Sequence, residues 1–278
     1  MMAVLQHAVP VATLIFVVSS MVAMGLGLTV SEITAPLRNV RLVGMSLLAN
    51  FVLMPVTAVL LARVLRLDEP FTVGLLLLSV AAGAPFLPKL AQLAKGDVAF
   101  AVALMVVLMV ITVGYLPVIL PMLLPGVTVK PAEIAKSLVV MMLLPLAVAL
   151  AVRAKLAGAA AAAQPWFNRL SSLGLVAVTL LVVVVNFKNV LSVFGTGAIL
   201  AGLSFVAIGY GVGWALGGPN ASTRPVLGLG TAQRNIAAAF VVAGQNFSNP
   251  NVVVMVVVVA NVGLLILLPL ARRLATSG

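Results

Sequence analysis

Nine long apolar runs follow one another along the chain, with charges, prolines and glycines between them. About 20 apolar residues in a helix span the roughly 30 Å hydrocarbon core of a bilayer. Within lipid, a helix satisfies its backbone hydrogen bonds internally. The sequence therefore predicts an all-α integral membrane protein with nine transmembrane helices. The predicted spans are His7–Val30, Leu42–Ala62, Pro70–Ala94, Val98–Leu124, Ala132–Val152, Leu170–Val190, Gly195–Leu216, Thr223–Gln245 and Val252–Leu270.

The composition leaves little room for anything besides these spans. Of the 278 residues, 63% are hydrophobic and 8% are charged, and the mean hydropathy is +1.29. A soluble domain of this composition could not cover its surface with polar groups. We expect a single polytopic domain over residues 1–278. Its first half covers about 1–152, a linker loop with an alanine-rich tract covers about 153–168, and its second half covers about 169–278.

Basic residues give the chain a formal net charge of +11, which basic loops at a membrane surface explain better than nucleic-acid binding does. Loops after odd-numbered spans carry nine Lys or Arg residues, whereas loops after even-numbered spans carry five. By the positive-inside rule, this bias predicts an N-terminus outside and a C-terminus in the cytoplasm, across the plasma or inner membrane. The two remaining basic residues, Lys89 and Arg234, fall inside spans.

Two of the predicted spans contain residues that a lipid-facing helix would exclude. The third span holds the stretch Val80–Lys89, and the eighth holds Val226–Ala239. We expect broken helices at the glycines and prolines of these stretches, namely Gly83, Pro85, Pro88, Gly228 and Gly230. Spans three and eight cross in opposite directions and therefore fit an inverted-topology repeat, in which interrupted spans mark the substrate site.

A broken helix exposes backbone N–H groups on one half-helix and C=O groups on the other, which attract anions and cations respectively. Polar side chains gather in these stretches or can reach them. We predict that the substrate or ion site is formed by Arg234, Gln233, Asn235, Thr231, Lys89 and Asn50. Gln233 and Asn50 are also the candidate sodium ligands. The lack of cysteine and the single His7 argue against a further metal centre.

Arg234 carries the strongest signal of a functional site. It lies ten residues beyond Arg224, about 15 Å along a helix, and so near the middle of the bilayer. A charge at that depth lines a cavity or meets a partner. Arg234 either contributes to the site, directly or in place of a bound cation, or pairs with carbonyls of the opposing break and holds the crossing together. Lys89 is about 9 Å along a helix from Lys95 and could partly snorkel towards the surface.

The acidic residues indicate what the site does not contain. All five fall at span ends, where we expect solvated loop residues rather than a buried proton relay. They are Glu32, Asp68, Glu69, Asp97 and Glu133. We find no nucleophile–base pair either, and the sequence therefore argues against an enzyme.

Four blocks of the sequence resemble the bile acid:sodium symporter family: Met24–Asn39, Asn50–Leu67, Leu93–Val102 and GTAQRNIAAAF at Gly230–Phe240. The resemblance implies a core domain of inverted repeats, in which two broken helices cross, and a panel domain beside it. Members of the family have ten helices or nine, and this chain is similar to the nine-helix type. The resemblance also implies transport of organic anions, usually with Na⁺.

The sodium-binding residues that this resemblance implies are largely replaced. Where the family has Gly-Thr-Ala-Ser-Asn in its first crossover, this chain has Ala84–Pro88. The partner hydroxyls fall on Ala101 and Met105, and the glutamate that bridges both sodium sites falls near Leu229. We therefore hypothesise that the side chains of Lys89 and Arg234 stand where the two sodium ions would bind.

The sequence thus predicts a secondary transporter of small organic anions that works by alternating access, with the solute and the lipid bilayer as its partners and no cofactor. One alternative is a conventional sodium-coupled organic anion or bile acid symporter, whose ions bind mainly backbone carbonyls together with Gln233, Asn235 and Asn50. An alternative of another class is a non-transporting membrane receptor or scaffold. The identity of the solute, the coupled ion and the oligomeric state stay open.

Overall fold

The computed structural model describes all residues except 1, 35–37, 125–129, 186, 192 and 278. All the regular secondary structure of the described residues is helical, without a strand. Its elements are α1 (Met2–Gly27), α2 (Val30–Thr34), α3 (Val40–Leu48), η2 (Ala49–Leu53), α4 (Met54–Val64), α5 (Glu69–Val80), α6 (Leu87–Leu93), α7 (Val98–Leu123), α8 (Pro131–Leu138), η3 (Val139–Leu143), α9 (Leu144–Lys155), α10 (Ala157–Val185), α11 (Phe187–Leu191), α12 (Ala198–Leu216), α13 (Thr223–Ala232), α14 (Ile236–Asn246) and α15 (Pro250–Ser277).

Eight helices in the described residues are long and apolar enough to cross a membrane, judged by length and composition. They are Ala8–Gly27, Val40–Val64, Val98–Leu123, Pro131–Lys155, Ala157–Val185, Ala198–Leu216, Thr223–Asn246 and Pro250–Thr276. The third predicted span, Pro70–Ala94, is instead divided into α5 and α6. With 12 residues, α5 extends only about 18 Å. The count of nine transmembrane helices is therefore not confirmed, and a joint crossing by α5 and α6 remains a prediction.

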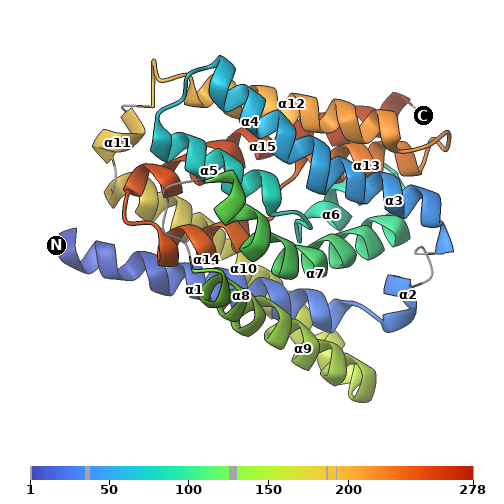
Figure 1. The fold of residues 1–278 in the computed structure, drawn as a ribbon. Coiled ribbons are helices and arrows are strands. Elements are labelled where there is room, and N and C mark those ends of the chain that lie inside the picture. The colour runs from blue at the N-terminus through green and yellow to red at the C-terminus, as the bar shows by residue number, and fades with distance from the viewer. Residues whose placement is uncertain (1, 35–37, 125–129, 186, 192, 278) are drawn as a thin grey trace.

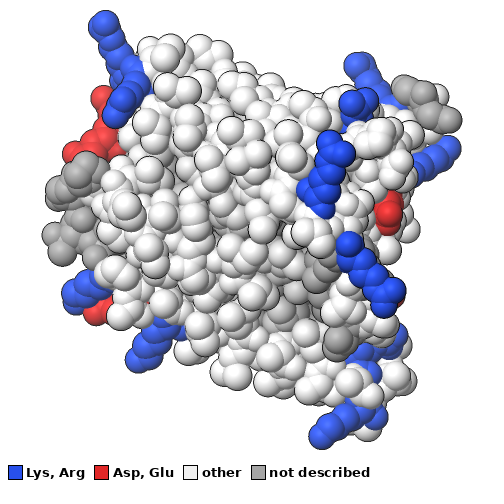
Figure 2. Space-filling model, turned by 45° about the vertical axis from the view of Figure 1, so that its right-hand side comes forward, with Lys and Arg blue, Asp and Glu red and all other residues white. Residues whose placement is uncertain are grey.

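The charged side chains agree with a protein embedded in a bilayer. Figure 2 shows Lys, Arg, Asp and Glu gathered towards two opposite sides of the molecule, with a broad belt of other residues between them. As predicted, the acidic residues lie at helix ends: Glu69 and Glu133 in the first turns of α5 and α8, and Asp97 at the N-cap of α7. These findings support a multi-pass membrane protein.

The predicted linker loop at 153–168 is wrong. Helix α9 continues to Lys155, and α10 begins at Ala157, two residues later. The alanine-rich tract at 159–163 thus lies in the first turns of a helix of 29 residues. Alanine has the highest intrinsic helix propensity, so this tract favours a helix over a flexible connection. The division of the chain into halves at about 152 and 169 stays a prediction.

The helices pack in two groups (Figure 1). In the first group, α1 packs along α10 and α9. In the second, α12 packs on α13 and α15, and α5 packs on α15 and α4. Helix α14 contacts both groups, because it packs on α1 and α8 as well as on α15 and α5. The two interrupted segments, α5–α6 and α13–α14, both belong to the second group.

Candidate functional site: two helix breaks and a buried arginine

The first break separates α5 from α6. Helix α5 ends at Val80, and residues 81–86 are not helical. Gly83 has a φ of +80°, and a Cβ added there would lie 2.3 Å from the backbone nitrogen of Met109 on α7. Only glycine suits both that backbone conformation and that close approach. The Thr112 hydroxyl, one turn further along α7, accepts from the Ala82 N–H at 3.0 Å and donates to the Ala82 carbonyl at 3.2 Å.

The second break separates α13 from α14. Helix α13 ends at Ala232, and residues 233–235 are not helical. Asn235 is the N-cap of α14, because its side-chain oxygen accepts from the Ala238 N–H at 3.0 Å. Such a cap satisfies one of the backbone N–H groups that a helix start leaves without an internal partner. Asn235 is therefore the residue that allows α14 to begin inside the protein.

The two breaks are joined by hydrogen bonds. The Asn235 N–H donates to the Ala81 carbonyl at 2.9 Å, and the Asn235 side-chain amide donates to the Gly83 carbonyl at 3.1 Å. Both acceptors lie in the first break, more than 150 residues earlier in the sequence. The prediction that the two interrupted segments meet is therefore confirmed by these contacts, and the backbone groups freed by one break are satisfied by the other.

Arg234 lies at this crossing with only 3% of its surface exposed. Its Nε donates to the Leu78 carbonyl at 3.0 Å, and its Nη2 donates to the Ser79 carbonyl at 2.6 Å. Its Nη1 donates to Asn50 Oδ1 at 2.8 Å and to the Thr231 carbonyl at 3.2 Å. Leu78 and Ser79 are among the last residues of α5, where helix carbonyls lack internal partners and the helix dipole is negative. The guanidinium thus occupies the cation-attracting end of a half-helix.

Asn50 reaches this crossing from a third element. It lies in the π-helical segment η2 and is fully buried. Besides accepting from Arg234, it donates through Nδ2 to the Ser46 carbonyl at 3.0 Å and to the Thr231 hydroxyl at 3.3 Å. Single-turn π segments occur often at functional sites. Arg234, Asn50 and Thr231 therefore form one buried hydrogen-bonded cluster, which we call the crossover cluster.

Gln233 adjoins the crossover cluster but is not bonded into it. Its side chain is 6% exposed, and its Oε1 has no hydrogen-bond partner among the described residues. A small cavity of about 10 Å³ lies beside it, and Leu78, Gln233, Arg234 and Gly263 are among the residues that line this cavity. Such a volume is close to the smallest that holds one water molecule.

Lys89 does not belong to the crossover cluster, contrary to the prediction. Its side chain is exposed on α6, and its Nζ donates to Gln92 Oε1 at 3.2 Å on the same helix. The expectation of a second buried cation beside Arg234 is wrong. Lys89 lies in the first turn of α6 after the break, where the helix turns its side chain outward while Leu87 and Leu90 face the interior.

The glycines and prolines divide between the breaks and the helices beside them. Gly83 and Pro85 lie in the first break, and Pro88 lies in the first turn of α6. Gly228 and Gly230 are inside α13, so the prediction that they break this helix is wrong. They permit close packing instead: an added Cβ at Gly228 would lie 3.0 Å from the Tyr210 ring, and one at Gly230 would lie 2.8 Å from Leu87.

Two contributions to the site were missed in the sequence. Thr112 is buried in the strongly apolar helix α7, and such an isolated hydroxyl could have signalled its bonds to the first break. Tyr115, one turn further along, donates its hydroxyl to the carbonyl of Phe51, the residue after Asn50. The carbonyls of Leu78 and Ser79 carried no signal, because their side chains are ordinary for a transmembrane helix.

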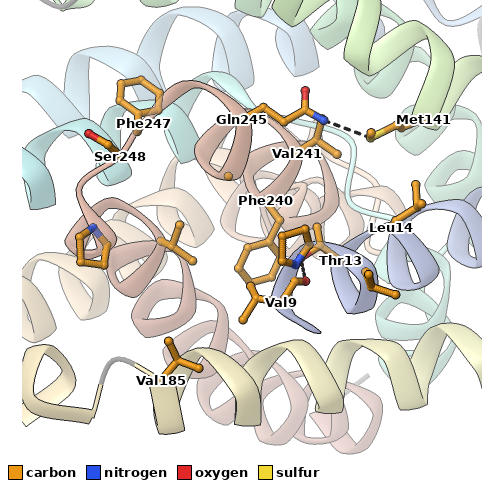
Figure 3. A pocket seen from close by; sticks show the side chains of 15 residues that line it. Val9, Thr13, Leu14, Met141, Val185, Phe240, Val241, Gln245, Phe247 and Ser248 are labelled. Atoms are coloured by element: carbon orange, nitrogen blue, oxygen red, sulfur yellow. Dashed lines mark hydrogen bonds between the residues drawn. The ribbon is translucent and has the colours of Figure 1, made fainter. Parts of the chain in front are cut away.

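A crevice of about 650 Å³ lies between the two groups of helices (Figure 3). Residues of α1, η3 and α10 line one side, and residues of α14 and α15 line the other. Among the described residues that line it, none is charged, and neither Arg234 nor Lys89 takes part. Its walls include Phe240, Phe247 and several valines, while Thr13, Gln245 and Ser248 supply side-chain polar groups.

Comparison with known protein families gives a match to the first two thirds of the chain. Residues 14–193, nearly two thirds of the chain, match the model of the Sodium Bile acid symporter family. No curated protein matches the chain. The family match covers Asn50 and the first break but ends before the second break, and it therefore does not bear on Arg234.

Proposed function

Because the chain belongs to the sodium bile acid symporter family, we propose that it is a secondary transporter of small organic anions that works by alternating access. The family is one of transporters rather than enzymes. We further propose that the N-terminus lies outside and the C-terminus in the cytoplasm, as the distribution of basic loop residues indicates. The crossing of two helix breaks inside the protein supports this function, since such crossings form the binding sites of secondary transporters.

We also propose that transport does not require Na⁺. The observation that carries this step is the guanidinium of Arg234 on the carbonyls of Leu78 and Ser79. The C-terminal end of α5 attracts a cation because the helix dipole is negative there. In this protein that cation is the guanidinium of Arg234. Four of the five N–H groups of Arg234 donate to oxygens of the protein, two of them to these carbonyls and two to Asn50 Oδ1 and the Thr231 carbonyl. Its charge therefore compensates the break rather than binding the solute directly.

A sodium-coupled symporter remains the second candidate, because Gln233 Oε1 is buried without a partner beside a small cavity. An amide oxygen in such a place could bind a sodium ion. Arg234 lines the same cavity, however. A sodium ion there would face a fixed positive charge in surroundings of low dielectric constant, where repulsion is strong. This argument favours sodium independence.

Uptake into proteoliposomes tests the proposal. The wild-type protein should take up members of a panel of organic anions, including cholate and pyruvate, at equal rates in sodium and choline buffers. Arg234→Ala should abolish uptake. Lys89→Ala is the matched control and should retain uptake, because the Lys89 side chain is exposed and its hydrogen bond goes to Gln92 on the same helix.

Each of the other outcomes has a definite meaning. A strong sodium requirement of the wild-type protein would overturn the sodium independence and leave the transporter in place. Stabilisation of the protein by an anion, without uptake under any gradient of Na⁺, H⁺ or membrane potential, would favour a receptor instead.

A further inference from the structure

A second pocket lies at the end of the molecule where α3 begins and where α12 is followed by α13 (Figure 1). Its volume is about 230 Å³, which is smaller than the usual pocket for a drug-sized ligand. It shares no lining residue with the crevice, and no member of the crossover cluster lines it. This pocket is therefore separate from the site described above.

Arg41, in the first turn of α3, supplies the charge of this pocket. Its side chain is exposed, and no hydrogen bond or ion pair joins its guanidinium to another of the described residues. No acidic side chain is among the residues that line the pocket. A guanidinium group can donate two parallel hydrogen bonds to a phosphate. The pocket thus offers a positive group that has no negative partner.

Further donors surround Arg41. Asn39 caps α3, because its Oδ1 accepts from the Leu42 N–H at 3.1 Å. The N–H groups of Val40 and Arg41 have no acceptor among the described residues, and the positive end of the helix dipole lies there. Asn220, in the turn before α13, lines the pocket from the other element, and its side-chain amide is exposed. These groups add to the attraction of an anion by Arg41.

The end of α12 is the one unfavourable feature, since the carbonyls there carry the negative end of a helix dipole. Two contacts offset it. The guanidinium carbon of Arg224 lies 5.6 Å from the centre of the Trp214 ring, in the last turn of α12. The hydroxyl of Thr223 donates to the Gly217 carbonyl at 2.9 Å. A basic side chain therefore already accompanies the helix end that would repel an anion.

The pocket also has an apolar part, formed by Leu42, Met45, Ala215 and Leu216. Met45 lies four residues beyond Arg41, about 6 Å further along the helix and so deeper in the bilayer. A free phosphate ion would gain nothing from this surface. The glycerol group and the first methylene groups of a lipid would leave water on contact with it. The arrangement of charge and apolar surface thus favours a lipid.

From this geometry we propose that the pocket binds the phosphate of an anionic membrane phospholipid, with Arg41 as its principal donor. Basic pockets between transmembrane helices on the cytoplasmic side bind the headgroups of such lipids. Arg41 belongs to the basic loops that indicate the cytoplasmic side of this protein. The bound lipid joins the start of α3 to the turn before α13. It is a resident ligand rather than the transported solute.

Arg41→Gln tests the charge. The purified full-length protein in detergent micelles is titrated with dioleoyl phosphatidylglycerol or dioleoyl phosphatidylcholine, and bound lipid is measured by native mass spectrometry. The wild-type protein should prefer phosphatidylglycerol, because the choline ammonium group of the other lipid is repelled by Arg41. Arg41→Gln should weaken binding of phosphatidylglycerol about tenfold, as for the loss of a hydrogen bond between charged groups. Lys155→Gln is the matched control, since this exposed residue of α9 lies on the same predicted side and does not line the pocket.

Ala215→Phe tests the apolar part. Ala215 is exposed on α12 and lines the pocket, so the larger ring should fill the space of the lipid and abolish the preference for phosphatidylglycerol. Gly211→Phe is the matched control, one turn earlier on α12. A Cβ added at Gly211 meets no atom within 4 Å, and Gly211 does not line the pocket. Phosphatidylglycerol should also raise the unfolding temperature of the wild-type protein and of both controls, but not of Arg41→Gln or Ala215→Phe.

The proposal is overturned if the wild-type protein binds the two lipids equally, if Arg41→Gln binds phosphatidylglycerol like Lys155→Gln, or if Ala215→Phe binds it like Gly211→Phe. Competition by glycerol 1-phosphate as strong as that by the whole lipid would assign the pocket to a free phosphate ester instead of a lipid. The two variants alter different ends of the pocket, so misfolding of one leaves the other decisive. Lipid binding is measured without transport, and failure of the proposed transport would therefore leave this result unchanged.

Discussion

Removing the guanidinium of Arg234 should turn the crossing into a site that requires an added cation. In Arg234→Ala, the Ser79 carbonyl, the Thr231 carbonyl and Asn50 Oδ1 lose their donors, and the hydrogen bonds among the described residues offer none of them a second one. The Leu78 carbonyl keeps its bond from the Ala81 N–H. A buried acceptor without a partner costs about 1–3 kcal/mol, so the three together cost about 3–9 kcal/mol. Water entering the vacated space would bring the loss towards the lower value.

The assay combines thermal unfolding with chemical rescue. Arg234→Ala should unfold at a lower temperature than the wild-type protein and should not transport. Guanidinium ions at low millimolar concentration should restore part of both properties, because they can donate to the oxygens that Arg234 leaves. Urea is the matched control, since it has a similar planar shape without the charge. A folded Arg234→Ala protein that responds equally to urea and guanidinium, or to neither, would refute the assignment of Arg234 as a tethered cation.

Three further substitutions test the surroundings of the site. Thr112→Val removes the hydroxyl that bonds both backbone groups of Ala82 and should lower stability by about 1–3 kcal/mol, measured as a fall in the unfolding temperature that Thr112→Ser does not show. Gly83→Ala places a Cβ 2.3 Å from Met109 N at a φ of +80°; it should abolish uptake or folding, whereas Gly211→Ala should leave both unchanged. Thr29→Val removes the side-chain hydrogen bond that, with the Thr29 N–H, lowers the pKa of Glu32 below its ordinary value. The contribution of Glu32 to stability is present above its unfolded pKa and is lost as the pH falls through the lower folded pKa. Thr29→Val should raise the folded pKa of Glu32, which carboxyl ¹³C NMR can measure. An unchanged pKa would contradict the hydrogen bond between Thr29 and Glu32.

The membrane class and the meeting of the two interrupted segments could be predicted because both depend on residue type. Long apolar runs determine helices in lipid, and a charge such as Arg234 can remain at depth only beside a partner. The helix at 157–168 was not predicted, because an alanine-rich tract between two apolar runs resembles a linker although alanine has a high helix propensity. The exact positions of the helix breaks could not be predicted, because they depend on tertiary contacts. A glycine in a span can either permit an unusual backbone conformation or make room for a neighbouring side chain. Gly83 permits a left-handed backbone, whereas Gly230 gives Leu87 room against α13.

The depth of a basic residue could be predicted only in part, because position along a span does not determine the direction of its side chain. Lys89 and Arg234 both fall inside predicted spans, but Lys89 is exposed and Arg234 is buried. The partners of Arg234 explain the difference. They include backbone carbonyls of Leu78 and Ser79, which any sequence would provide. They become available only because α5 ends there, and the end of α5 depends on the packing of Gly83 against α7.

A cation that is part of the chain changes what can drive transport. A mobile sodium ion that binds together with a solute couples solute movement to its gradient, because the ion must travel with the solute. Arg234 cannot leave the crossing, so on the proposed function its charge stabilises the broken helices in every conformation without transferring energy from an ion gradient. Net movement of the anion would then follow its own electrochemical gradient. A membrane potential of 100 mV contributes about 2.3 kcal/mol per elementary charge. For a monovalent anion, an interior-positive potential should therefore accelerate uptake where a sodium gradient has no effect.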